Sequence, residues 1–328
     1  MFVLLYVLFM KKDYYIFKSG ALKRKDFNVI HVDTEGKKTV LPINTIDNLF
    51  IFSHLDINAD TLCYLGKLEI SVHFFDHYEN YRGTFFGIEK QISGSLILKQ
   101  AEFCMDNLKR IYIAKQFIES AMYNIYKNLL EYDIKITIPK DKLSNANSIQ
   151  EIMGIEGSFR NEYYSYYDKI FTRYKFEKRT KQPPLNEINS LISFGNMMCY
   201  CFCLKTIRQT QLNSTISYLH EPTDRRHSLS LDLAEIFKPI IIDKIIFKLI
   251  NKNIIKDEHF EKTDSFCYIK ENGKKLFVTE FEEKLNTKFY YRKTKNNVSY
   301  KQLILFECYK LIKHFLNIEE YKSLKLDW

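Results

Sequence analysis

The chain has little tryptophan, no paired-cysteine motif and no apolar run long enough to cross a membrane. It contains one Trp among 328 residues, against 26 Phe and 23 Tyr, and its seven Cys include no CxxC pair. A zinc ribbon is therefore excluded. The three thiols of the CYCFC segment, Cys199, Cys201 and Cys203, are predicted to be buried and reduced, which indicates a cytoplasmic protein. No Walker A loop and no GxSxG elbow are present.

The apolar stretch at the start of the chain is short. Residues 1–9 read MFVLLYVLF, whereas a spanning helix needs about 20 residues. A secretory signal carries basic residues before its apolar run, but here the lysines follow it. We expect no membrane association, and we interpret residues 1–9 as an extension from an upstream start codon, with Met10 as the native start.

Charge and length give a first indication of partners. The 49 Lys and Arg exceed the 40 Asp and Glu, for a net charge of +9, and the hydrophobic fraction is 46%. Such a chain is long enough for two ordered domains. A modest basic surplus favours polyanionic partners, and Tyr and Phe near basic residues suit the stacking of bases.

The pattern of apolar residues changes from strand-like to helical along the sequence, which predicts an α+β fold of two domains. Residues 14–94 contain short β-branched and aromatic runs such as NVIHV and LEISVHFF, with Gly, Asp and Asn between them. From residue 95 the apolar residues recur at helical spacing, first in a single run of about nine turns to residue 132. We predict a β-rich domain over 1–94 and an all-α domain over 95–328.

Two stretches of the helical half carry candidate metal ligands. In MGIEGSFRNEYY, Glu156 lies between Gly154 and Gly157, and two glycines inside a helix are costly unless something approaches the backbone closely. In YLHEPTDRRHSLSLDLAEIFKP, His220 precedes a helix that carries Asp232 and Glu235 on one face. One imidazole with two or three carboxylates suits Mg²⁺ or Mn²⁺. An exposed helix end and acidic residues that stabilise a helix N-terminus remain the alternatives.

A third stretch is basic and interleaved with aromatics. RYKFEKRTKQPP holds Arg173, Lys175, Lys178, Arg179 and Lys181 within nine residues, beside Tyr and Phe. Such a segment suits a phosphate backbone, although a charged run is often only a solvated face.

These stretches together resemble one family, the integrase of CRISPR adaptation, which is the universal CRISPR-associated endonuclease that inserts new spacers. The resemblance covers nearly the whole chain from Met10. It rests on motifs in the correct order: KKDYYIFKSGALKRKDFNVIH, GIEGSFRNEYY, KRTKQPPLNEINSLISFGN, YLHEPTDRRHSLSLDLAEIFKP, and the closing helix SYKQLILFECYKLIKHFLN with EEY after it. The YLHEP…RR motif resembles that of family members from type I CRISPR systems of subtype B.

The resemblance implies a metal-dependent DNA integrase. It places the three metal ligands and catalytic residues on Glu156, His220 and Glu235, with Asp232 as a supporting acid. It also implies Mg²⁺ or Mn²⁺, double-stranded protospacer and repeat DNA, a homodimer, and a small ferredoxin-like partner subunit that completes a heterohexamer. Many members carry Asp at the third ligand position, where this chain has Glu. From charge and position, the residues expected to contact DNA are Arg173, Lys178, Arg179, Lys181, Arg225 and Arg226.

In spacer integration the attacking group is the 3′-hydroxyl of a DNA end, so the protein needs no nucleophile of its own. Two other functions remain open at this point. The first is a DNA-binding scaffold of the adaptation complex without catalytic activity, against which the complete set of Glu156, His220 and Glu235 argues. The second is a metal-dependent hydrolase of small phosphates, which would show little salt dependence of binding.

Overall fold

The computed structural model describes residues 11–76, 78, 80–88, 91–222 and 227–326. The interpreted extension over residues 1–9 lies outside this part of the chain. The chain divides into two compact units, residues 1–90 and 91–328. The change of sequence period places the boundary at Gly94, which is the first residue of helix α2.

The N-terminal unit contains two four-stranded sheets, as the strand-like runs predict. In one sheet the order is β1-β5-β7-β8, with β1, β5 and β7 parallel, and in the other it is β4-β3-β2-β6. The elements are β1 Lys12–Ile16, β2 Gly20–Lys25, β3 Asn28–Asp33, β4 Lys38–Leu41, a 3-10 turn Ile43–Thr45, β5 Ile46–Ile51, β6 Leu55–Ile57, α1 Ala59–Lys67, β7 Ser71–Phe75 and β8 Tyr81–Phe85.

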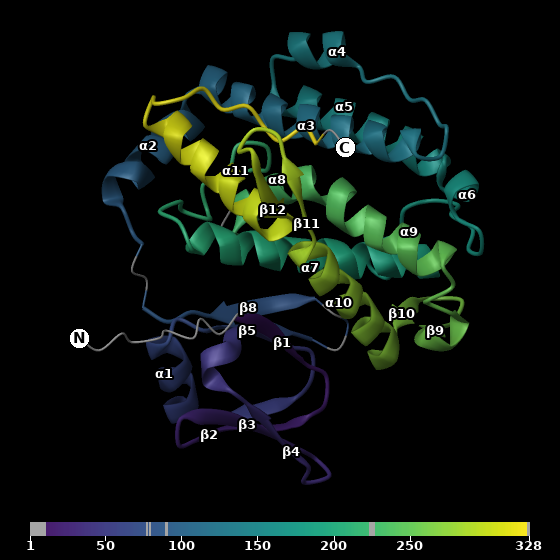
Figure 1. The fold of residues 1–328 in the computed structure, drawn as a ribbon. Helices are drawn as coiled ribbons and strands as arrows, with labels where there is room; N and C mark the ends of the chain where they lie inside the picture. The colour runs from purple at the N-terminus through teal and green to yellow at the C-terminus, as the bar shows by residue number, and fades with distance from the viewer. Residues whose placement is uncertain (1–10, 77, 79, 89–90, 223–226, 327–328) are drawn as a thin grey trace. The chain divides into compact units, whose positions relative to one another are not determined.

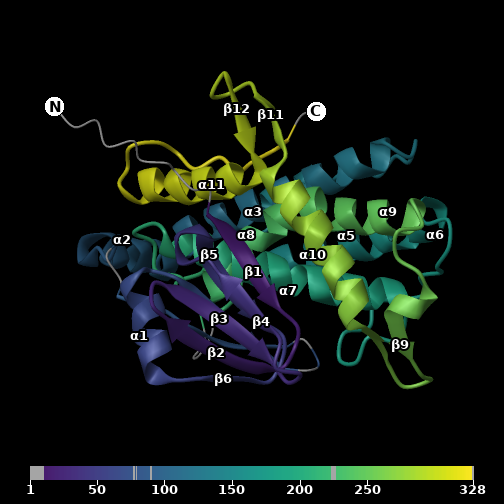
Figure 2. The ribbon, with the colours of Figure 1, turned by 60° about the horizontal axis from the view of Figure 1, so that its bottom comes forward.

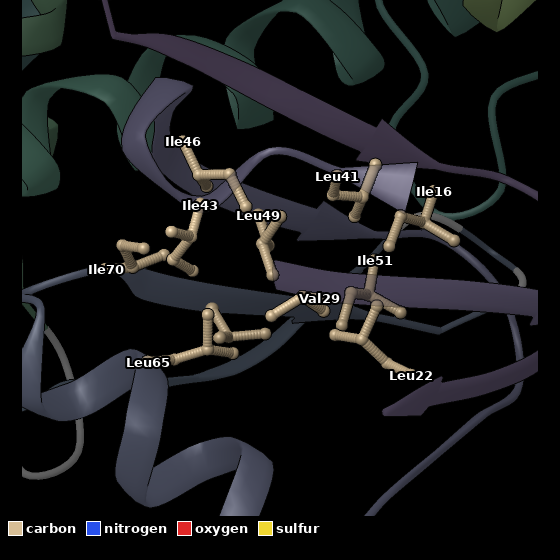
Figure 3. Packing of buried hydrophobic residues seen from close by; sticks show 11 residues of the cluster. Ile16, Leu22, Val29, Leu41, Ile43, Ile46, Leu49, Ile51, Leu65 and Ile70 are labelled. Carbon is tan, nitrogen blue, oxygen red and sulfur yellow. The ribbon is translucent and has the colours of Figure 1, made fainter. Parts of the chain in front are cut away.

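Aliphatic side chains from both sheets and from α1 meet in one core (Figure 3). Alternation along the strands sends Val29 inward from β3, and Leu49 and Ile51 inward from β5, because side chains of residues two apart share a face. Leu65 reaches the same cluster from α1. Each buried aliphatic side chain contributes about 1.5–3 kcal/mol, so this core stabilises the small unit.

The C-terminal unit is mostly helical, with α7 running through it (Figures 1 and 2). Its elements are α2 Gly94–Met105, α3 Asn107–Leu130, α4 Lys140–Asn145, α5 Ile149–Ser165, α6 Tyr167–Ile170, α7 Glu187–Arg208, α8 Ser228–Phe237, a π-helical turn Lys238–Asp243, α9 Lys244–Asn251, a 3-10 turn Asp257–His259, β9 Phe260–Lys262, β10 Cys267–Ile269, α10 Glu271–Asn286, β11 Lys288–Tyr291, β12 Asn296–Ser299 and α11 Tyr300–Phe315.

Helix α7 is the core helix of this unit. Among the described residues it alone is long and apolar enough to cross a membrane, but 83% of its apolar window is buried inside the protein. Burial by neighbouring helices explains why apolar residues surround α7 on all sides. Cys199, Cys201 and Cys203 lie in it, and all three are buried free thiols, as predicted.

The mostly helical character expected of this unit is confirmed, but the structure corrects two details of the expectation. The helical run after residue 95 is not continuous, because Asp106 adopts an extended backbone and its carboxylate accepts the N–H groups of Leu108 and Lys109, which begins α3. The unit is also not all-α, since β9 pairs with β10 and β11 with β12 as two antiparallel hairpins. Their strands have only three or four residues, too few for a period of two to be recognised beside long helices.

Candidate active site

Three elements of the C-terminal unit carry the predicted ligands. Glu156 lies in the middle of α5, Glu235 lies in α8, and His220 lies in the loop between α7 and α8. Helix α3 packs against both α5 and α8, and α8 also packs against α7 (Figure 1). Residues far apart in the sequence are thereby held in one region.

Helix α8 ends at Phe237, two residues after Glu235, and becomes irregular there. Pro239 has no N–H to donate, and the chain continues as a π-helical turn. Two buried asparagines of α3 donate to carbonyls near it: Asn124 to Ile236 at 3.1 Å and Asn128 to Pro239 at 2.7 Å. These bonds fix the end of α8 and the turn after it to α3.

Asp232 anchors the loop that presents His220. The Asp232 side chain is fully buried and accepts the backbone N–H groups of Tyr218, Leu219 and His220 at 2.7–3.0 Å. Its Oδ1 also lies 2.8 Å from Nδ1 of His220. With the carboxylate ionised, Nδ1 carries the proton, and Nε2 is left with a lone pair. This carboxylate–imidazole pair is the usual support of a metal-binding histidine.

The environment of His220 holds negative charge near the ring. Burial acts to lower the pKa of His220, but the hydrogen bond with Asp232 and the charges of Asp232 and Glu235 outweigh it, so the pKa is raised. Glu235 is therefore one of the two carboxylates whose charge acts on the His220 ring. The His220 side chain is 29% exposed and therefore accessible to a ligand.

Arg160 connects the two predicted glutamate ligands. Its Nε lies 2.5 Å from Glu156 Oε1, one turn earlier on α5, and its terminal nitrogen lies 2.9 Å from Glu235 Oε2. Lys238, one turn after Glu235, places Nζ 2.5 Å from the other oxygen, Oε1, and 4.8 Å from the centre of the Tyr200 ring. The cluster therefore alternates in charge, acid–base–acid–base.

The pairing keeps Glu235 ionised although it is buried. Burial by itself would raise the pKa of Glu235, but the charges of Lys238 and Arg160 dominate and lower it to about 2. The pKa of Lys238 is raised by the same partner against the effect of burial. Leaving either charge unpaired in this environment is strongly unfavourable, by about 3–5 kcal/mol.

The donor set fits a hard divalent cation. One imidazole nitrogen and two carboxylates are ligands that Mg²⁺ and Mn²⁺ accept. Over the ranges that the structure describes, however, no three His, Cys, Asp or Glu side chains are gathered tightly enough to make a complete metal shell. Arg160 and Lys238 engage the two oxygens of Glu235. A cation would have to share or replace these contacts.

The two glycines beside Glu156 leave the surface of α5 open. No atom outside the local backbone lies within 4 Å of a Cβ built at Gly154 or Gly157. Within the part of the chain that the structure describes, no other segment therefore approaches the backbone there.

Replacing Gly157 by Ala is expected to stabilise the protein by about 1 kcal/mol, because alanine is the better helix former and the methyl group has room. We expect DNA cleavage to fall at the same time, since the methyl group occupies the surface beside Glu156. Urea unfolding and a cleavage assay measure the two effects. Ser158→Ala, at the neighbouring exposed position, is the control, and a stabilised variant of full activity would contradict the second expectation.

In the basic stretch 173–181, the two arginines bind other side chains of the protein, whereas the lysines are exposed. Arg173 pairs with Asp257 at 2.6 Å, and Arg179 bonds to Asn189 Oδ1 and to Ser193 Oγ, each at 3.0 Å. Arg179 therefore fixes the stretch to α7. Lys175, Lys178 and Lys181 are exposed. Arg225 and Arg226 lie outside the described residues.

Three residues near the site were not singled out from the sequence: Lys238, Asn124 and Asp243. The spacing of Lys238 three residues after Glu235 was a usable signal, because such pairs share a helix face. The contacts of Asn124 and Asp243 join α3 and α5 to the segment after α8, and no local pattern indicates them.

Asp243 is a buried acid next to the charged cluster. Burial raises its pKa to about 6, although Arg160 and the hydroxyl of Tyr163, which donates at 2.8 Å, act in the opposite direction. Since the folded-state pKa exceeds the unfolded value of 3.8, folding favours the protonated form. The stabilisation is complete below about pH 4 and is lost as the pH rises through 6.

Asp243→Asn is therefore expected to raise the free energy of unfolding at pH 8 by up to about 3 kcal/mol, the equivalent of two pKa units. The gain should vanish towards pH 4. Urea unfolding at pH 4.5, 6 and 8 measures it, and a gain that does not change with pH would contradict the assignment.

Comparison with known proteins identifies the family. The sequence profile of "CRISPR associated protein Cas1" matches residues 14–283. The chain belongs to the Cas1 family. It is 44% identical over 322 residues to a CRISPR-associated endonuclease Cas1 of Moorella thermoacetica, covering 97% of this chain and 100% of the relative.

Solved structures agree with this assignment. The Cas1 protein TM1797 of Thermotoga maritima is 37% identical, with a TM-score of 0.87 over 95% of this chain and 100% of that one. A casposase, in a structure bound to integration product, is similar in fold alone, with 22% identity and a TM-score of 0.85 over 96% of this chain and 93% of that one. The Cas1 relationship confirms the family expected from the motifs and the order of a strand-rich region before a mostly helical one.

Proposed function

We propose that this Cas1 chain is a divalent-metal-dependent DNA endonuclease and integrase, which joins the 3′-hydroxyl ends of protospacer DNA to the CRISPR repeat. The observation that carries the proposal is the buried Asp232, which binds the His220 ring at Nδ1 and leaves Nε2 as the ring nitrogen for a ligand, while the charge of Glu235 also acts on this ring. The relative from Moorella thermoacetica, which is 44% identical to this chain, is a CRISPR-associated endonuclease by name.

Glu156, His220 and Glu235 would hold the Mg²⁺ or Mn²⁺ ion. When bound, such an ion polarises a phosphodiester and lowers the pKa of an attacking hydroxyl. The chain's own residues perform the remaining tasks. Asp232 keeps the proton of His220 on Nδ1, and Arg160 and Lys238 keep Glu235 ionised in a buried position. The same two cations add positive charge where a phosphate gains negative charge in the transition state.

For DNA contacts we propose the exposed cations of the basic stretch. Lys178 and Lys181, with Lys175, are free to approach phosphates, whereas Arg173 and Arg179 position the segment through their bonds to Asp257 and to α7. Arg225 and Arg226 are proposed from sequence alone. A duplex held by several such contacts should dissociate steeply as salt is raised.

A strand-transfer assay tests the proposal. Labelled DNA with 3′-hydroxyl ends is incubated with a plasmid that carries a CRISPR repeat, with Mn²⁺, Mg²⁺ or a chelator. We expect covalent joining with either metal and none with the chelator. DNA with 3′-dideoxy ends should not be joined, because the attacking group is missing. Equal joining of dideoxy ends, or joining in the chelator, would overturn the mechanism, and no joining under any condition would favour a scaffold role.

The assembly is also a proposal. We propose a homodimer that binds a small ferredoxin-like CRISPR-associated subunit as a heterohexamer, in a cytoplasmic type I, subtype B-like system. Large apolar side chains on and beside α2 support an interface, since Leu98, Met105 and Leu108 are at least 73% exposed. Light scattering of the purified chain tests the dimer.

A further inference from the structure

The hairpin formed by β11 and β12 concentrates much of the positive charge of the chain. Between residues 284 and 306 the sequence contains no Asp or Glu, but it contains six basic residues, against a net charge of +9 for the whole chain. They are Lys284, Lys288, Arg292, Lys293, Lys295 and Lys301. The hairpin projects from the helical body beside α11 (Figure 2). The proposed catalytic function assigns no role to these six residues.

The two faces of the hairpin are different. On the inner face, Phe289 packs against Tyr300 with ring centroids 5.1 Å apart, and its cross-strand partner Val298 is 3% exposed. On the outer face, Lys288 and Tyr290 are exposed, with Tyr290 at 62%. The inner face supplies the packing that the fold needs, so folding does not require an aromatic residue at position 290.

The turn between β11 and β12 has a lysine at a position where the backbone conformation favours Gly or Asn. Lys295 has a left-handed backbone, with φ of 54°, a conformation in which Gly or Asn is usual. Arg292, Lys293 and Lys295 are exposed and, within the described part of the chain, form no ion pair with a carboxylate. Lysines often protect an exposed strand edge from pairing. That explanation does not account for an exposed Tyr290 between cations.

We propose that the β11–β12 hairpin is a binding arm for single-stranded DNA. The outer face offers an exposed ring for an unstacked base, with Lys288 about 6.7 Å away along the strand to hold the adjoining phosphate. Arg292 and Lys295 extend the cationic track around the turn. The absence of acids from the whole segment favours a polyanion over a protein of mixed charge.

The arm goes beyond the catalytic proposal, because binding there needs neither Glu156 nor His220. The single-strand assignment depends on Tyr290, since a paired base in a duplex does not present its face to a side chain. Cations alone would bind duplex and single strand alike.

The test uses the full chain and two probes of equal length, a fluorescein-labelled 20-nucleotide oligothymidine and a 20-base-pair duplex. Tyr290→Ala is expected to weaken oligothymidine binding about tenfold and duplex binding less than twofold. Tyr290→Phe should bind like the wild type, because the ring is retained. Tyr309→Ala, which removes an exposed tyrosine from α11, is the matched control and should change neither affinity.

The triple variant Lys288→Gln, Arg292→Gln, Lys295→Gln tests the charges. The slope of log affinity for oligothymidine against log salt should decrease by about 2, the value for three lost phosphate contacts. Lys135→Gln, Lys140→Gln, Lys142→Gln, at exposed positions before and within α4, is the charge-matched control. Thermal unfolding confirms that each variant is folded.

Unchanged oligothymidine binding by the Tyr290→Ala protein would contradict the proposal that the hairpin binds single-stranded DNA. An equal loss of affinity for both probes would contradict it as well. His220→Ala should retain full oligothymidine binding. A Tyr290→Ala protein that binds normally, beside a His220→Ala protein that has lost strand transfer, would reject the arm and leave the catalytic proposal intact.

Discussion

Replacing His220 by Ala is expected to abolish metal-dependent strand transfer and cleavage while the protein stays folded. The side chain is 29% exposed and its Nε2 is free to bind a ligand, so its loss removes a ligand without opening the core. The loss of rate should exceed the roughly 10–100-fold that removal of an outer-shell partner costs. Rates of joining at saturating Mn²⁺ measure it.

His54→Ala is the matched control, because His54 is an exposed histidine of the N-terminal unit. It should retain full activity. Unchanged product from the His220→Ala protein would remove His220 from the proposed metal site.

Asp232→Asn is expected to reduce both activity and stability. The carboxylate accepts four hydrogen bonds, from the backbone N–H groups of Tyr218, Leu219 and His220 and from the His220 ring. An amide replaces one acceptor oxygen by a donor, which then faces other buried donors. Each unsatisfied buried group costs about 1–3 kcal/mol, so we expect a loss of about 2–4 kcal/mol in the free energy of unfolding.

The role of Asp232 is to position His220, and the ring itself reports it. In ¹⁵N-labelled protein, Asp232→Asn should lower the pKa of His220, because the charge and hydrogen bond that raise it are gone. Strand transfer should fall about 10–100-fold. Asp264→Asn, at an exposed position, is the control. A variant with reduced stability but an unaltered His220 titration would show that Asp232 only supports the loop.

Local periodicity was sufficient for the main elements of this fold. Apolar residues at helical spacing predicted α5, α7 and α11, and alternating β-branched runs predicted the strands of the N-terminal unit. The same criterion failed at Asp106, where one side chain caps a new helix inside a continuous apolar pattern. It also missed the two hairpins, whose strands are too short to display a period.

The candidate site was partly accessible to sequence reasoning. The spacing of Asp232 and Glu235 placed both on α8, yet Asp232 bonds to the loop of residues 218–220, while Glu235 bonds to Arg160 of α5. Arg160 and Glu235 are 75 residues apart, so their contact depends on how α3 packs against α5 and α8. The sequence shows the two acidic residues but does not show which groups each carboxylate binds.

The most direct test of the catalytic account is an anomalous difference map from crystals soaked in Mn²⁺. We predict one strong peak between His220 Nε2 and the carboxylates of Glu156 and Glu235, lost in the His220→Ala protein. A map without a peak there, from crystals of protein that performs Mn²⁺-dependent strand transfer, would contradict the assignment of the metal to these three residues.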